Sequence, residues 1–222
     1  MPRLSRVLSA ATIAAASLVG IVAFLYPFTA PRQGGGFSPN AHVQDAPFLF
    51  VVLITFCLGA VLADLGMAQG SAKRVAILGI LTAIAAVLRA VQFVGFNAIF
   101  FLPILGGYVF GPRFGFLLGA LGLLVSALLG GIGPWLPFQM FATGWVGMLS
   151  GILPGKWLQR LGHWEALPLA LWGFLLGLTF GAVMNLWFWP FVFAPGQSAL
   201  YWEPGVGVEE TLRRYLAFYA IA

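Results

Sequence analysis

The chain has 222 residues, of which 61% are hydrophobic and only 8% are charged. Soluble domains carry about 25% charged residues, and a soluble fold of this length could not bury so much apolar surface, so the composition indicates an integral membrane protein. The net charge of +5 does not indicate nucleic-acid binding, because the basic residues are scattered singly or in pairs among apolar segments.

Apolar runs of about 20 residues, the length needed to cross a bilayer, recur along the chain. They predict an all-α fold, a polytopic transmembrane bundle of about eight helices. In chain order we expect helices over residues 7–26, 47–65, 75–93, 98–110, 114–130, 135–153 and 166–190, and a last one from residue 208. The sequence is still apolar at Ala222, so we expect the last helix to be incomplete.

The first helix follows Arg3 and Arg6, as the apolar part of a secretory signal peptide would. Its apolar run is longer than that of a usual signal peptide, and Thr29-Ala30-Pro31 is a poor cleavage site, so we expect an uncleaved helix. With a cytoplasmic N-terminus, the inner side receives the basic residues Lys73, Arg74, Arg113, Lys156 and Arg160. This bias follows the positive-inside rule and predicts a multi-pass protein of the cytoplasmic membrane.

The spacing of the helices predicts two parts that meet at Gly70-Ser71. Residues 1–70 hold two helices joined by a polar, glycine-rich loop, and residues 71–222 hold the remaining helices, which short turns connect. The first part therefore holds two of the eight expected helices, and the second part holds the other six.

Small residues recur at intervals of four, which places them on one helix face. Gly111, Gly115 and Gly119 form one such series, and Gly147, Gly151 and Gly155 form another. Close packing inside the bundle explains these glycines, because missing side chains let helices approach in lipid. In the third helix the candidates for docking onto another subunit are Gly79, Ala83, Ala86 and Ala90.

Polar and aromatic side chains gather in the segments that this topology places on the outer side. They are Arg89, Gln92, Phe96, Asn97, Trp135, Gln139, Asn185 and Trp187. Aromatic walls with a few amides and one cation suit a largely apolar ligand with polar edges. An interfacial aromatic belt would explain the tryptophans, but amides within spans usually mark a pathway or a helix contact. Arg89 either reaches the outer interface or faces the bundle and holds an anionic or carbonyl group.

Patterns of catalytic and cofactor chemistry are weak in this sequence. His42 and His163 fall in separate loops on opposite sides of the membrane, which argues against a metal site and a Ser–His pair. Residues 151–156 are one residue short of a phosphate loop and lack its Ser or Thr. We expect no enzyme activity and no cofactor, and another subunit would have to power uphill transport. A stand-alone carrier or facilitator, or a membrane-embedded enzyme, are the alternative interpretations.

Three stretches of the second part resemble the substrate-binding (S) component of energy-coupling factor (ECF) transporters. KRVAILGILTAIAAVLRAV (73–91) is similar to the first core helix of that family. FFLPILGGYVFGPRFGFLLGAL (100–121) resembles its second and third helices, which a tight Gly-Pro-Arg turn joins. GGIGPWLPFQMFATGWVGMLSGILP (130–154) is similar to the loop and fourth helix of an actinobacterial subgroup.

This resemblance implies a division of the chain, partners and a ligand. Residues 71–222 would form the six-helix core of the family, and residues 1–70 would be a two-helix N-terminal membrane extension. In the family, the alanine face of the first core helix docks onto a transmembrane coupling subunit, and two separate ATP-binding subunits power import. A vitamin or a metal ion binds near the outer surface. Some members hold nickel or cobalt through amino-terminal histidines, which this chain lacks. The resemblance therefore favours a vitamin, and the aromatic content suggests a ring system such as a corrinoid or a flavin.

Overall fold

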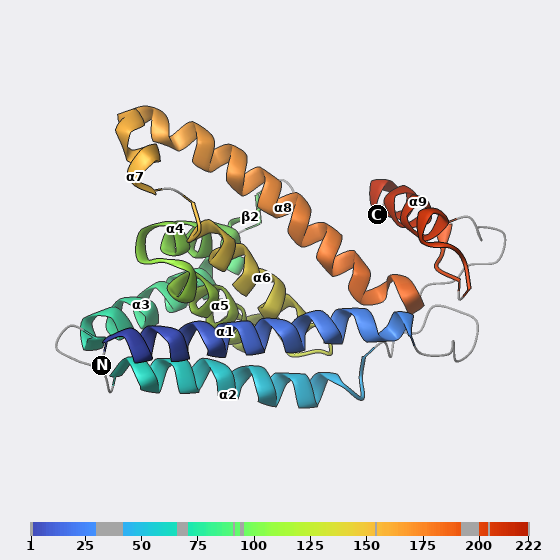
Figure 1. Ribbon diagram of the computed structural model, residues 1–222, viewed down its shortest axis with the longest axis horizontal. Coiled ribbons are helices and arrows are strands. Elements are labelled where there is room, and N and C mark those ends of the chain that lie inside the picture. The colour runs from blue at the N-terminus through green and yellow to red at the C-terminus, as the bar shows by residue number, and fades with distance from the viewer. Residues whose placement is uncertain are drawn as a thin grey trace.

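The computed structural model is a helical bundle (Figure 1) and describes residues 2–29, 42–65, 71–90, 92–93, 96–153, 155–191, 200–203 and 205–221. Its α-helices are α1 (Pro2–Leu25), α2 (Ala46–Leu65), α3 (Ser71–Ala90), α4 (Phe101–Phe110), α5 (Pro112–Gly130), α6 (Leu136–Ser150), α7 (Gly155–Leu158), α8 (Ala166–Phe188) and α9 (Val208–Ile221). Short 3₁₀ turns lie at η1 (Tyr26–Phe28), η2 (Ala98–Phe100), η3 (Gln159–Glu165) and η4 (Trp189–Phe191). A small antiparallel hairpin joins β1 (Gln92–Phe93) to β2 (Phe96–Asn97).

Within the described residues, four helical segments are long and apolar enough to cross a membrane: Ala11–Phe28, Ala46–Ala63, Pro112–Gly130 and Gln159–Phe191. A shorter apolar helix spans Ala98–Phe110. Together with the helical content, these segments confirm the predicted all-α, multi-pass membrane bundle. The third predicted helix is too long by three residues, because α3 ends at Ala90 and the chain then pairs Gln92 with Asn97 and Phe93 with Phe96.

Glycines hold the centre of the bundle together where α5 meets α6. A Cβ on Gly115 would overlap the carbonyl oxygen of Gly147, and one on Gly119 would overlap that of Thr143. A Cβ on Gly151 would likewise overlap the backbone of Pro112 at the start of α5. Gly115, Gly119, Gly147 and Gly151 therefore serve internal packing, which lets the backbones touch directly.

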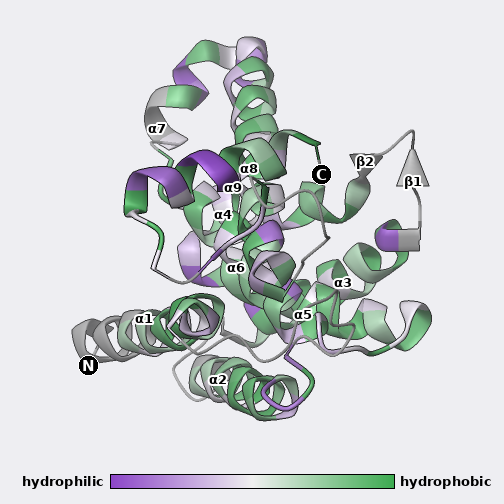
Figure 2. Cartoon of the chain, turned by 90° about the vertical axis from the view of Figure 1, so that its right-hand side faces the viewer, coloured by the Kyte–Doolittle hydropathy of each residue, from purple (hydrophilic) through white to green (hydrophobic). Residues whose placement is uncertain are grey.

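The first two helices pack side by side and antiparallel against the rest of the bundle, as Figures 1 and 2 show. Gly20 of α1 lies against α6, where a Cβ would come within 2.8 Å of the Phe141 ring. The Trp145 Nε1 donates a hydrogen bond to Ser17 Oγ across the same contact, at 3.1 Å. Cys57 of α2 is buried in the shared core. The helices of residues 1–70 thus contact the helices that follow them.

Helix α8 diverges from the bundle toward α7 (Figure 1), and only 6% of the apolar span Gln159–Phe191 is buried. Large apolar side chains such as Leu167, Leu171 and Phe174 are exposed along it. Lipid solvates such a surface where water would not.

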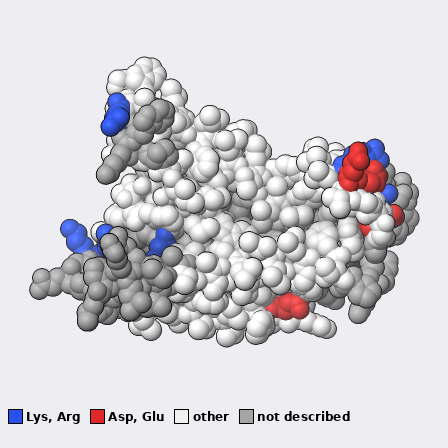
Figure 3. Space-filling model, viewed as in Figure 1, with Lys and Arg blue, Asp and Glu red and all other residues white. Residues whose placement is uncertain are grey.

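Charged side chains collect at the two ends of the long axis. Figure 3 shows lysine and arginine near the end where α1 begins, and acidic with basic side chains at the end where α9 lies. The visible surface between these ends is almost free of charge. Such a band matches the hydrocarbon layer of a bilayer.

Candidate functional site

Arg89, in the last turn of α3, bridges two other helices. Its Nη1 donates a hydrogen bond to Ser126 Oγ of α5 at 2.8 Å, and its Nη2 donates to Gln139 Oε1 of α6 at 3.2 Å. Ser126 Oγ donates in turn to the carbonyl oxygen of Leu123 at 2.7 Å. We call Arg89, Ser126 and Gln139 the Arg89 cluster.

Helix packing one turn earlier explains why these side chains meet. A Cβ on Gly122 of α5 would lie 3.2 Å from the Cβ of Ala85, so α3 and α5 approach closely there. Arg89 and Ser126 each lie four residues further along, on the same helix faces. The position of Arg89 near the C-terminus of α3 also places its positive charge at the negative end of the helix dipole.

The guanidinium of Arg89 is half-buried and has neutral partners. Among the described residues, the ion pairs between arginine and carboxylate lie elsewhere, around the arginines of α9. An arginine keeps its charge in a protein, so the Arg89 cluster is a positive centre bounded by a hydroxyl and an amide. Such a centre can hold a carboxylate or a carbonyl group.

The hairpin continues directly from α3 beyond Arg89. Its register sets Gln92 opposite Asn97 and Phe93 opposite Phe96. The backbone therefore brings the two predicted amide residues together, close in sequence to Arg89. The side chains of Gln92, Phe96 and Asn97 lie outside the described part of the structure.

Trp135 lies at the start of α6, on the same helix face as Gln139 four residues later. Its side chain covers Gly133, where a Cβ would overlap the indole ring. Trp135 is 38% exposed, so part of its ring is accessible.

Trp187 belongs to a second cluster rather than to the Arg89 cluster. Its ring stacks on His42, with centroids 5.9 Å apart, and lies against Phe138. Phe138 precedes Gln139 on α6, and consecutive helix residues point in different directions. Asn185 is half-buried on α8, and its carbonyl oxygen accepts a hydrogen bond from the Trp189 backbone N–H. The structure thus brings Arg89 and Gln139 together and places Trp187 beside His42.

His42 was not among the predicted site residues, yet its side chain is fully buried. Its Nε2 donates to the carbonyl oxygen of Trp187 at 3.0 Å, and its Nδ1 lies 3.6 Å from Asp45, which also accepts a hydrogen bond from Tyr26. Burial lowers the pKa of His42, although Trp187 and Asp45 oppose the shift. We call Tyr26, His42, Asp45, Phe138 and Trp187 the His42 cluster.

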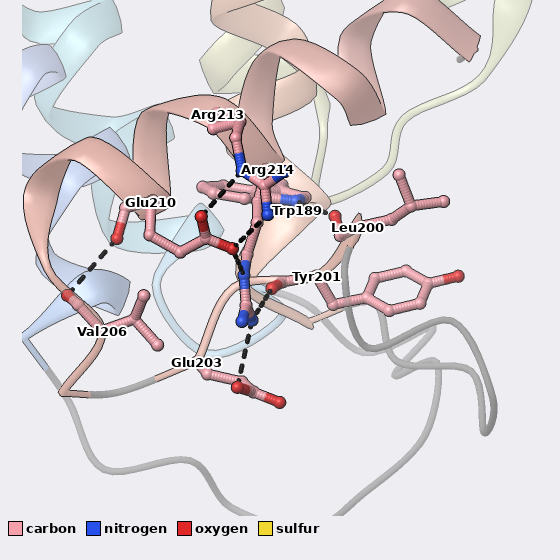
Figure 4. Close-up of polar contacts among 9 residues, drawn as sticks. Trp189, Leu200, Tyr201, Glu203, Val206, Glu210, Arg213 and Arg214 are labelled. Atoms are coloured by element: carbon pink, nitrogen blue, oxygen red, sulfur yellow. Dashed lines mark hydrogen bonds and ion pairs between the residues drawn. The ribbon is translucent and has the colours of Figure 1, made fainter.

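Arg214 fastens the segment between α8 and α9 to α9 (Figure 4). Its Nη1 donates to Glu203 at 3.0 Å and to the Tyr201 carbonyl oxygen at 3.2 Å, and its Nε donates to Glu210 at 2.9 Å. Trp189 Nε1 donates to the Leu200 carbonyl oxygen at 3.0 Å. The Tyr201 ring and its neighbours are therefore held in an aromatic cluster with α9.

Helix α3 presents an open apolar stripe on the side away from α5. Gly79 and Ala83 are exposed, and Ile80, Ile84 and Val87 are 62%, 45% and 59% exposed. The two other predicted docking residues, Ala86 and Ala90, are not part of this described exposed stripe. Ala86 is 3% exposed and faces the inside of the bundle, whereas the side chain of Ala90 lies outside the described part of the structure.

Ser126 is the residue of the Arg89 cluster that sequence reasoning missed. It is the one hydroxyl side chain of α5, and a polar residue within an apolar span usually marks a helix contact or a pathway. That rule would have singled it out. His42 and Asp45 could have been found as a His–Asp pair three residues apart, flanked by apolar residues.

Comparison with curated proteins and with solved structures gives no match. A family model described as the substrate-specific component of ECF transporters matches residues 73–221. That match includes α3 to α9, and helices α1 and α2 precede it. The matched segment is well over half of the chain, and the chain therefore belongs to the family of ECF transporter substrate-specific components.

Proposed function

We propose that this chain captures a vitamin-like small molecule with a ring system at the outer surface and passes it to a coupling subunit for ATP-driven import. Family membership makes the chain a substrate-specific transporter subunit. The family consists of transporter components and is not an enzyme family. Membership also implies pairing with a membrane coupling subunit and ATPases. The finer assignment rests on the Arg89 cluster.

The observation that carries this proposal is the positive charge of Arg89 beside neutral partners from α5 and α6. Ionisable residues within membrane spans are costly and usually functional. A ligand carboxylate or carbonyl group would accept hydrogen bonds from the guanidinium, and Ser126 and Gln139 would offer further hydrogen bonds. Exposed aromatic surface at Trp135 would stack on a ring. A corrinoid or a flavin fits this combination.

The position of Arg89 supports binding from the outer side. Lys73 and Arg74 lie at the opposite end of α3, and the positive-inside rule favours the cytoplasm for that end. In this orientation the N-terminus is cytoplasmic, the protein lies in the cytoplasmic membrane, and Gln92 and Asn97 of the hairpin border the exterior. The Arg89 cluster then lies where an external solute arrives.

The open stripe of α3 is the surface that we assign to the coupling subunit. Gly79 and Ala83 are accessible, and a Cβ on Gly79 would meet no atom of the described structure within 4 Å. Ala86 is enclosed within the chain, so the neighbouring exposed residues Ile80, Ile84 and Val87 replace it in this proposal. Residues 71–222 form the transporter core in this view, and residues 1–70 are an added membrane extension.

Mass spectrometry of small molecules that the purified chain retains tests the proposal. We expect a ring-containing compound to stay bound to the wild-type chain and to be lost from Arg89→Ala, with Arg160→Ala as a matched control. Arg160 is an exposed arginine of η3, far from α3 in the sequence. Retention of the same compound by Arg89→Ala would contradict the proposed site.

A further inference from the structure

A cavity of about 670 Å³ lies between α1 and the beginnings of α3 and α5, with α6 contributing to its wall. Its volume is within the range of about 300–1,000 Å³ that is usual for small-molecule sites. Neither Arg89 nor Gln139 lines it, so it is separate from the site proposed above. Apolar side chains such as Ile13, Leu78 and Leu117 form most of its surface.

Two arginines give this cavity a charged edge. Arg74 lies in the first turn of α3 and Arg113 in the first turn of α5, and both line the cavity. Arg113 is held in place from a third helix, because its Nη2 donates to the carbonyl oxygen of Ala60. The residue before α5 is Gly111, which has no side chain to cap the helix, so the partial positive charge of the helix N-terminus adds to that of the arginines.

We propose that this cavity binds an anionic phospholipid, with the headgroup phosphate at Arg74 and Arg113 and an acyl chain along the apolar wall. Charge complementarity selects the headgroup, since the described residues that line the cavity include two arginines and no Asp or Glu. A zwitterionic lipid would bring a cationic group to the same arginines. Free phosphate would use the charged edge alone and would leave the apolar surface of Leu78 and Leu117 uncovered.

The position of the cavity gives the lipid a structural role. One wall comes from Ile13, Ala14 and Ser17 of α1, which precedes the part of the chain that matches the family model. The other walls belong to α3, α5 and α6, which lie inside that part. The lipid therefore joins the first helix to the family core, at the membrane side where anionic lipids attract basic residues.

Native mass spectrometry of the purified full-length chain tests this proposal. The chain is delipidated and then given phosphatidylglycerol or phosphatidylcholine with the same acyl chains. We expect one molecule of phosphatidylglycerol to be retained in preference to phosphatidylcholine. The double variant Arg74→Gln/Arg113→Gln should bind phosphatidylglycerol about 30-fold more weakly, because it lacks two basic contacts. The control Arg160→Gln/Arg213→Gln removes the same charge from exposed positions elsewhere and should bind like the wild type.

A second variant examines the apolar part of the site without changing its charge. Val75→Trp places a large ring in the cavity wall and should reduce phosphatidylglycerol binding. This variant tests the proposed site even if the double arginine variant does not fold. Inorganic phosphate should not displace the lipid. Equal retention of the two lipids by the wild type, or unchanged phosphatidylglycerol binding in Val75→Trp or in a folded double variant, would overturn the proposal.

Discussion

Gly115 of α5 and Gly147 of α6 each occupy the space that a side chain on the other helix would need. A Cβ on either glycine would overlap the carbonyl oxygen of the other. Their reciprocal contact is the closest kind of approach that two helices in lipid can make. It fixes the distance between α5 and α6, and therefore the positions of Ser126 and Gln139, which these helices carry.

We expect Gly147→Ala to destabilise the protein by about 1–3 kcal/mol, because the added methyl group forces the two backbones apart. Gly177→Ala is the matched control, since a Cβ there meets no atom of the described structure within 4 Å. Thermal unfolding in detergent measures both variants. Equal unfolding temperatures would show that the α5–α6 contact does not limit stability.

Arg89→Lys should weaken ligand binding by about 10- to 100-fold, even though it keeps the positive charge. A lysine is a point donor and cannot span Ser126 and Gln139 as the planar guanidinium does. Isothermal titration with the compound identified by mass spectrometry gives the affinities. Ser126→Ala should give a smaller loss, since it removes one partner. Wild-type affinity in Arg89→Lys would mean that geometry at this position is unimportant.

Acidification should destabilise the protein through His42. Burial lowers the pKa of His42 in the folded state, so the unfolded chain binds a proton first as the pH falls below about 6.5. The contribution of His42 to stability is therefore complete above that pH and declines below it. His42→Gln should flatten the dependence of unfolding temperature on pH between about 7 and 5, whereas His163→Gln, which replaces an exposed histidine, should not. An unchanged profile in His42→Gln would count against this role.

Arg214→Ala should loosen the segment that precedes α9, and Arg213→Ala should not. The side chain of Arg214 is 15% exposed and joins Glu203 to Glu210. That of Arg213 is 72% exposed and forms an ion pair with Glu210. Exposed ion pairs contribute little. Limited proteolysis measures the difference, with faster cleavage after residue 200 expected for Arg214→Ala. Equal cleavage of the two variants would rule out the fastening role.

Ala83→Trp should prevent co-purification with the coupling subunit while leaving ligand binding intact. The substitution adds bulk to the open stripe of α3, where Ala83 is exposed. Val109→Trp, at a 65% exposed position on α4, controls for added bulk on a lipid-facing helix. Normal complex formation by Ala83→Trp would move the proposed interface away from α3.

Much of the fold follows from the sequence, because the length of each apolar run along the chain is enough to predict a helix. Apolar runs long enough to cross lipid predicted the positions of α1 to α6, α8 and α9. The hairpin escaped prediction, since the mostly apolar sequence of α3 continues through Phe93, and Gln92 and Phe93 pair with residues beyond that run. Spacing by four correctly located the helix contacts of Gly115, Gly119, Gly147 and Gly151, whereas a Cβ on Gly111 would meet no atom of the described structure within 4 Å.

The candidate site was harder to predict, because it depends on how each helix is rotated. Sequence position suggested that Trp187 and Gln139 share one pocket, yet Trp187 stacks on His42. Ser126 and Arg89 meet because Ala85 and Gly122 bring their helices together one turn earlier. Such pairings are set by tertiary packing, which a single sequence does not display.

The small buried fraction of α8 has a consequence for how the protein responds to its membrane. Helix α8 is 23 residues long, slightly more than the roughly 20 that cross a bilayer upright. The first half of α8 is largely exposed, with Leu167, Leu171 and Phe174 outside the bundle, so hydrophobic mismatch acts on its inclination. A thinner bilayer will make this helix lie flatter and a thicker one will raise it, which makes lipid chain length a direct control on the shape of the subunit.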